Sequence, residues 1–384
     1  MRLLERERTL LYYRFYGGLE RKMPKKKISK EKSIRRAKLL TELIICLFII
    51  GFGVIAIKNA TDKSRKVEKT EYYEDKDIPI PDESQPVTSN DPNKIIFENE
   101  TINTKAKFRG DLILVNENHQ YFSGDEKLVS ILEKNDEKGV DCFTAVNYDY
   151  TILDVVYEPM VKMIQGFYSE KNLNDIMIYG SYRSTEFQQQ LYDADLAATG
   201  NEESTRVAKP GYSEHESGYA FDFSRYEIGS GAPVDYDGTG EYEWFTKNCY
   251  KYGFVIRYTQ SKEDITKIQY EPWHFRYVGL AHSYYMTKNN ICLEEYIELL
   301  RDHPYSSDSS THLEFSDDAD NAYEVYFVAS DDGSEATNVP VPTGLTYDIS
   351  GNNVDGFIVT IHKEKNIQES TTQSETTSYK EITE

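Results

Sequence analysis

The sequence predicts an α+β protein that is preceded by one membrane-spanning helix and followed by a small β module. Three observations lead to this expectation. Apolar residues recur at helical spacing in several segments, short aromatic and β-branched runs lie between these segments, and one continuous apolar stretch lies near the N-terminus. The four cysteines show no C-x-x-C spacing, so a disulfide framework does not organise the chain, although a Cys249 to Cys292 bridge stays open as an alternative.

The apolar stretch runs from Leu39 to Ile57. As a helix it would reach about 28 Å, close to the ~30 Å thickness of bilayer hydrocarbon. A Lys/Arg cluster directly precedes it and orients the N-terminus toward the cytoplasm. A cleaved signal peptide is the alternative, but KNATDK follows in place of an A-x-A site. We therefore expect a basic cytoplasmic segment (1–38), a single-pass anchor in the cell membrane (39–57), and the rest of the chain outside the cell.

The remaining chain divides by composition. Residues 58–104 are rich in charged residues, Pro and Ser and are expected to form a disordered stalk, and the Ser/Thr/Glu-rich residues 366–384 a disordered tail. Between them we expect a larger folded domain (105–303) and a small β module (304–365), in which short strands are separated by Asp-Gly and Gly-Asn turns. The formal charge of −21 argues against a nucleic-acid partner, because phosphate binding needs clustered Lys and Arg on the folded part.

Within the central body the patterns predict helices and strands in mixed order. A first helix has apolar residues at spacings of three and four, and capping-box spacing of Thr185 and Gln188 predicts the start of a second helix that runs to about Ala198. The other expected helices are 242–252, 280–288 and 293–300, and the expected strands are 176–179, 218–224, 254–258, 270–277, 324–328 and 357–361.

Two of the seven histidines lie in settings that suggest chemistry: His215 in SEHESGYAFD and His274 in EPWH. With Asp222 they supply a His-Asp-His set, and a zinc ion in a hydrolytic site needs two or three such ligands and one open position. Glu271, three residues before His274, could take a proton from a zinc-activated water. These residues predict a Zn²⁺ site with a glutamate base.

The pattern S-x-H-x-x-G-x-A-x-D followed by E-x-W-H resembles the LAS metallopeptidases, a group with VanY-type D-alanyl-D-alanine carboxypeptidases, VanX-type dipeptidases and the hedgehog signalling domain. The resemblance covers residues 110–300. It implies a mixed or antiparallel sheet with flanking helices, with His215, Asp222 and His274 as zinc ligands and Glu271 as base. It further implies that Arg183 stabilises the oxyanion and that Gln188 and Ser213 contact the peptide.

Each of these last roles has a structural alternative. Arg183 could pair with surface carboxylates, Gln188 could serve in the capping box, and Ser213 could form a turn. The expected function is removal of the terminal D-alanine from peptidoglycan stem peptides. The alternatives are an L,D-carboxypeptidase or a D,D-dipeptidase with the same site, and a non-catalytic zinc module that binds the cell wall.

Overall fold

The computed structural model describes residues 95–363, except for positions 123, 125, 126 and 205. The predicted cytoplasmic segment, the membrane anchor, most of the stalk and the C-terminal tail lie outside the described residues. No helix among the described residues is long and apolar enough to cross a membrane. The three cysteines of this part of the chain are free, buried thiols, so no Cys249 to Cys292 bridge is formed.

Helices and strands alternate through the central body, as the periodicity predicts. Strand and helix starts agree with the expected positions to within two residues at most sites, but the helix expected over 242–252 is broken into one α-helical and two 3-10 segments. The elements of this part are η1 (Thr104–Phe108), β2 (Leu128–Ser130), α3 (Ile131–Lys138), β3 (Thr144–Ala145), β4 (Thr151–Leu153), α4 (Asp154–Lys171), β5 (Ile176–Gly180), α5 (Thr185–Thr199), η2 (Glu214–Ser217), β6 (Ala220–Tyr226), β7 (Pro233–Val234), η3 (Gly240–Tyr242), α6 (Glu243–Asn248), η4 (Cys249–Tyr252), β8 (Phe254–Tyr258), η5 (Gln260–Lys262), α7 (Glu263–Thr266), β9 (Glu271–Tyr277), α8 (Leu280–Asn289) and α9 (Leu293–Arg301).

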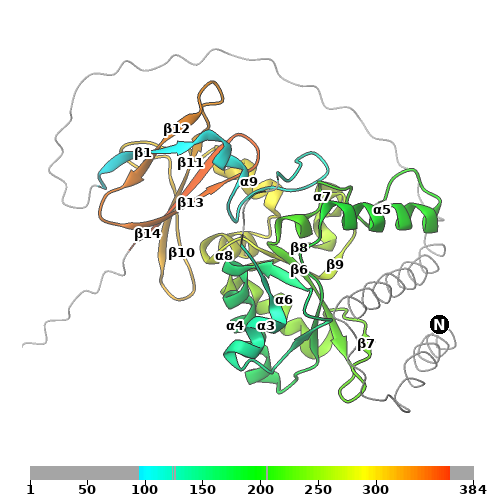
Figure 1. Cartoon of the computed structure of the whole chain (residues 1–384). Coiled ribbons are helices and arrows are strands. Elements are labelled where there is room, and N and C mark those ends of the chain that lie inside the picture. Colours follow the sequence, from blue (N-terminus) through cyan, green and yellow to red (C-terminus); the bar gives the residue numbers. More distant parts are fainter. Residues whose placement is uncertain (1–94, 123, 125–126, 205, 364–384) are drawn as a thin grey trace, which may run out of the picture. The chain divides into compact units, whose positions relative to one another are not determined.

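A mixed sheet forms the centre of this part, with the strand order β3-β5-β6-β9-β8. The short strand β7 pairs with the C-terminal end of β6. Strands β3 and β5 are parallel, and the other neighbours are antiparallel. Helix α4 has apolar residues at spacings of three and four, which form one face. This face is buried in a cluster with apolar residues of the sheet. Helices α3, α4 and α6 lie together beside the sheet in Figure 1, while α5 lies apart from them.

The C-terminal strands form the β module. A four-stranded antiparallel sheet has the order β10-β11-β14-β13, and β1 pairs with β12 in a separate two-stranded ribbon. Figure 1 shows β1, from the start of the described chain, beside β12. The strands are β1 (Phe97–Asn103), β10 (Leu313–Ser316), β11 (Ala322–Ala329), β12 (Ala336–Pro342), β13 (Thr346–Gly351) and β14 (Gly356–Lys363).

Strand β1 corrects the predicted stalk, which was expected to stay disordered through residue 104. Its sequence FENETIN has few apolar residues, and its side chains are mostly exposed, so no alternating apolar pattern predicts a strand. Its order comes from backbone pairing with β12, more than 200 positions away in the chain, where Phe97 lies opposite Pro342 and Asn103 opposite Ala336. The β module therefore includes residues that precede the central body in the chain.

The β module and the central body share an apolar core. One buried cluster joins Leu112 and Leu114 with Leu293 and Leu300 of α9 and with Val325 and Ile358 of the module. Backbone bonds add to this contact, since Leu114 N–H donates to Asn352 O at 3.0 Å. The module and the central body are thus parts of one hydrophobic structure.

Candidate metal centre

Three neighbouring strands place a row of site residues across the sheet. In the antiparallel register, Asp222 of β6 lies opposite His274 of β9 on one side and opposite Gly180 of β5 on the other. A Cβ atom at Gly180 would lie 2.1 Å from Asp222 Oδ2, so a side chain there would displace the carboxylate. Strand pairing and one glycine therefore fix the position of Asp222.

His215 reaches the same place from the short 3-10 helix η2. Its Nδ1 lies 2.9 Å from the backbone carbonyl oxygen of Ser181, and the N–H of Arg183 donates to the carbonyl oxygen of His215 at 3.2 Å. A carbonyl oxygen can only accept, so His215 Nδ1 carries the proton and Nε2 is left with its lone pair. Gly218 ends η2 at a φ of +73°, a conformation that favours glycine and turns the chain into β6.

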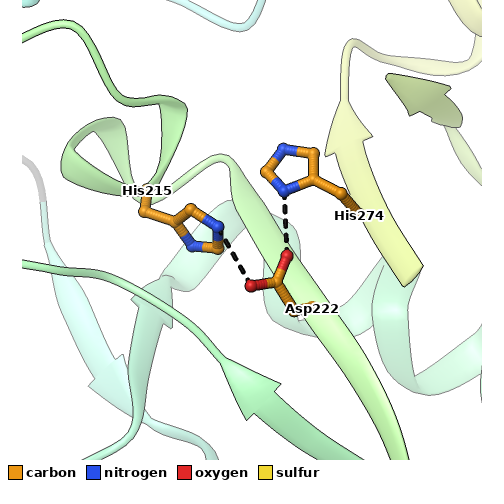
Figure 2. A group of neighbouring side chains, drawn as sticks. All are labelled: His215, Asp222 and His274. Atoms are coloured by element: carbon orange, nitrogen blue, oxygen red, sulfur yellow. Dashed lines mark hydrogen bonds and ion pairs between the residues drawn. The ribbon is translucent and has the colours of Figure 1, made fainter. Parts of the chain in front are cut away.

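The three side chains converge, as Figure 2 shows. Asp222 Oδ2 lies 3.2 Å from His215 Nε2, and Asp222 Oδ1 lies 2.8 Å from His274 Nδ1. One ligand atom from each residue lies within 4.8 Å of the others, and both histidines are buried. Two imidazole nitrogens and one carboxylate match the three-ligand donor set that zinc takes in catalytic sites. The predicted ligands are therefore brought together in a group whose chemistry fits Zn²⁺.

Burial and the close contacts change how these groups bind protons. Burial and the charge of Arg183 lower the pKa of His215 to about 4, so this imidazole is neutral at physiological pH. Burial alone would lower the pKa of His274, but hydrogen bonds to Asp222 and Glu214 outweigh it and raise the pKa to about 9. Burial would raise the pKa of Asp222, yet the two histidines hold it well below its usual value. A bound cation must therefore displace a proton from His274.

Glu271 and Arg183 lie at the edge of this group. Glu271 Oε2 is 4.0 Å from His274 Nδ1, and burial raises the pKa of Glu271 to about 7. Arg183 Nη2 donates to Asp222 Oδ2 at 2.9 Å. The partner of Arg183 is thus the central carboxylate of the candidate metal group, and the alternative of a pair with surface carboxylates is wrong.

The two residues predicted to contact the peptide are almost fully buried. Gln188 donates from Nε2 to Ala208 O at 2.8 Å, and its Oε1 lies 3.5 Å from Arg183 Nη1. The expected capping box of Thr185 and Gln188 is wrong, because Ser184 is the N-cap residue of α5 and accepts from Phe187 N–H. The peptide-contacting role of Gln188 stays a prediction.

Ser213 is the N-cap residue of η2, the helix that carries His215. Its backbone N–H lies 3.3 Å from the carboxylate of Glu216. The turn-forming alternative therefore agrees with the structure, and contact with the peptide stays a prediction.

Sequence reasoning missed the charged residues behind His274. Glu214 is the unspecified residue x in the S-x-H motif. It faces His274 Nε2 at 3.4 Å and contacts both Arg257 and Arg276. An arginine inside each of the apolar strands FVIRY and HFRY was the available signal, because a buried cation requires a partner. Tyr258 covers His274, with ring centroids 4.9 Å apart.

Comparison with known proteins agrees with this geometry. The family model described as VanY, D-alanyl-D-alanine carboxypeptidase, matches residues 154–280, which include every predicted site residue. A D-alanyl-D-alanine carboxypeptidase of Enterococcus faecium is 31% identical over 327 residues, which are 83% of this chain and 94% of that protein. The chain belongs to the VanY family.

Two further relatives combine or vary this activity. The VanY-family chain is 37% identical over 129 residues to a bifunctional D-Ala-D-Ala dipeptidase and carboxypeptidase, VanXYC of Enterococcus gallinarum, and the match covers 33% of this chain and 68% of that protein. The crystal structure of the D,D-dipeptidase VanXYg with a D-Ala-D-Ala phosphinate analog has a TM-score of 0.60 and 30% identity, and covers 70% of this chain and 100% of that chain.

Membership of the VanY family decides between catalysis and binding alone. The chain is an enzyme, a zinc metallopeptidase of the D-Ala-D-Ala carboxypeptidase type. The alternative of a non-catalytic zinc module is therefore set aside.

Proposed function

We propose that this enzyme is anchored in the cell membrane and removes the terminal D-alanine from peptidoglycan stem peptides. The observation that carries the proposal is the group of His215, Asp222 and His274, with both histidines buried, beside a glutamate whose pKa is raised to about 7. A base with a pKa near the working pH can both accept and return a proton. This arrangement suits hydrolysis of an unactivated amide bond.

The proposed zinc ligands are His215, Asp222 and His274. Zinc there would supply a Lewis acid for the scissile carbonyl and lower the pKa of a bound water toward neutrality. Glu271 accepts a proton from the attacking water and gives it to the leaving amine as the peptide bond breaks. The bond to Asp222 holds the Arg183 guanidinium at the site. Its positive charge stabilises the negative charge that develops on the carbonyl oxygen.

The substrate assignment is tested with defined peptides. The full chain, loaded with Zn²⁺, is incubated with pentapeptide, tetrapeptide and tripeptide stems and with the dipeptide D-Ala-D-Ala, and products are identified by mass. The proposal requires loss of one alanine from the pentapeptide, with the tetrapeptide and tripeptide left intact. Cleavage of the tetrapeptide in its place would show an L,D-carboxypeptidase.

A D,D-dipeptidase is the second candidate. The similarity to the D,D-dipeptidase VanXYg, at a TM-score of 0.60, favours it. Release of free D-alanine from the dipeptide at a rate comparable to that from the pentapeptide would establish a double activity. Cleavage of the dipeptide alone would replace the carboxypeptidase proposal.

The anchoring part of the proposal rests on residues 39–57. Their apolar length and the preceding basic cluster support a single span with the catalytic domain outside the cell. The full chain should sediment with membranes, and the chain without residues 1–57 should stay in solution with its activity unchanged. A shortened chain that still sediments with membranes would contradict this assignment of the anchor.

A further inference from the structure

A buried carboxylate lies behind His274, on the side away from Asp222. Glu214 Oε2 is 3.4 Å from His274 Nε2, and the glutamate side chain is fully buried. Its other oxygen, Oε1, accepts from Arg257 Nε at 2.7 Å and from Arg276 Nη1 at 2.8 Å. Two guanidinium groups in direct contact keep this carboxylate ionised, so it can only accept hydrogen bonds.

The two nitrogens of His274 therefore face different acceptors. Nδ1 lies 2.8 Å from Asp222 Oδ1, inside the candidate metal group, while Nε2 faces Glu214. A histidine that binds a metal needs a lone pair on one nitrogen and carries its proton on the other. An acceptor that cannot donate holds the proton on the nitrogen that it faces, which here is Nε2.

We propose that Glu214 is a positioning residue that fixes the tautomer and the ring orientation of His274, so that Nδ1 is left to bind zinc. This inference rests on the proposed zinc site. The two histidines are then held by different means. His215 donates to the backbone carbonyl of Ser181, which no substitution removes, whereas His274 depends on a side chain that can be replaced.

Glu214 is itself held in place from two sides. Arg257 makes a bidentate pair with Glu294 of α9, at 2.9 and 2.7 Å. Arg276 donates from Nη2 to the carbonyl oxygens of Asp111 and Ile113, at 2.8 and 2.9 Å. Because both arginines are fixed by other contacts, the carboxylate between them cannot turn away from His274.

Glu214→Gln separates the acceptor role from side-chain size. The two arginines both donate at the position of Oε1, so the amide oxygen lies there and the amide NH₂ faces His274 Nε2. A donor at this place favours the tautomer with the proton on Nδ1, which competes with zinc. We expect the zinc dissociation constant of the full chain, measured by competition with a chelator, to rise about 10- to 100-fold.

Glu324→Gln is the matched control. It removes one negative charge from a different buried group, because the ion pairs of Glu324 are with His312 and Lys363 and not with either arginine that holds Glu214. Its zinc affinity should equal that of the parent even if its melting temperature falls. Parent-like affinity in Glu214→Gln would overturn the inference, and so would equal weakening in both variants.

A second measurement needs no variant, so the inference can still be tested if Glu214→Gln does not fold. In the zinc-loaded parent, with ¹⁵N-labelled histidine, the His274 ring should show a zinc-bound Nδ1 and a hydrogen-bonded Nε2–H. Zinc on Nε2 would overturn the inference while the zinc site itself stands. A parent chain that binds no zinc would instead refute the proposed function.

Discussion

Two glutamates on opposite sides of His274 have opposite proton affinities. Both are buried, but the pKa of Glu271 is raised to about 7, whereas the pKa of Glu214 is held below its usual value. The difference lies in what touches them. Burial dominates at Glu271, while Arg257 and Arg276 outweigh burial at Glu214.

This difference separates proton transfer from support. A carboxylate with a pKa near neutrality can exchange a proton during turnover, and one that is paired with two arginines cannot. The side of His274 toward Glu271 is thus suited to chemistry, and the side toward Glu214 is suited to fixing the ring.

The largest effect should come from removing a zinc ligand, because the roles of Glu271 and of Glu214 both require bound zinc. His215→Ala leaves two protein ligands, too few to hold zinc tightly, and should abolish both bound zinc and turnover. Metal analysis of the purified protein and a stem-peptide assay measure this. His362→Ala, at a partly exposed histidine of β14 that pairs with Asp348, should keep both. Full zinc content in His215→Ala would show that the zinc site is assigned to the wrong residues.

Glu271→Gln tests the side of His274 that is suited to chemistry. Zinc should remain bound, because none of the three proposed ligands is changed. The kcat should fall about 10²- to 10⁴-fold, because the water loses its proton acceptor and the amine its donor. Glu298→Gln, an exposed site on α9, serves as control. Turnover of Glu271→Gln within a few-fold of the parent would give the base role to another group.

Arg183→Ala should have a somewhat smaller effect. Loss of a cation that stabilises the oxyanion typically costs about 10²- to 10³-fold in kcat. Arg183 also donates to Asp222, so zinc affinity is measured in the same samples to separate the two roles. Arg225→Ala, which removes an arginine of β6 paired with Asp175, is the matched control. An unchanged kcat at full zinc occupancy would exclude the oxyanion role.

The pKa of Glu271 also predicts a pH dependence of stability in the zinc-free protein. Its folded pKa of about 7 lies above the ordinary 4.5, so the folded protein binds more protons than the unfolded chain between these values. Stability from this residue is therefore lost as pH rises through that window, by at most about 3 kcal/mol. Denaturant unfolding of parent and Glu271→Gln across pH 4.5 to 7 measures the difference. A constant difference would contradict the raised pKa.

The His-Asp-His group could be predicted from the sequence because its members occur in two short segments with distinctive spacing. The helices and strands around them follow from local periodicity. Glu214 could not be assigned, because its role depends on Arg257 and Arg276, more than 40 positions away. Strand β1 was missed for the same reason, since its polar sequence acquires its conformation only from β12.

Arg276 has one further consequence for the molecule as a whole. Its guanidinium joins Glu214 to the carbonyl oxygens of Asp111 and Ile113, and this segment is bound to the β module through Leu114 and Asn352. The 109–116 segment therefore connects the C-terminal strands with the residues behind His274, and a chimera that exchanged the module would have to preserve the contacts of this segment.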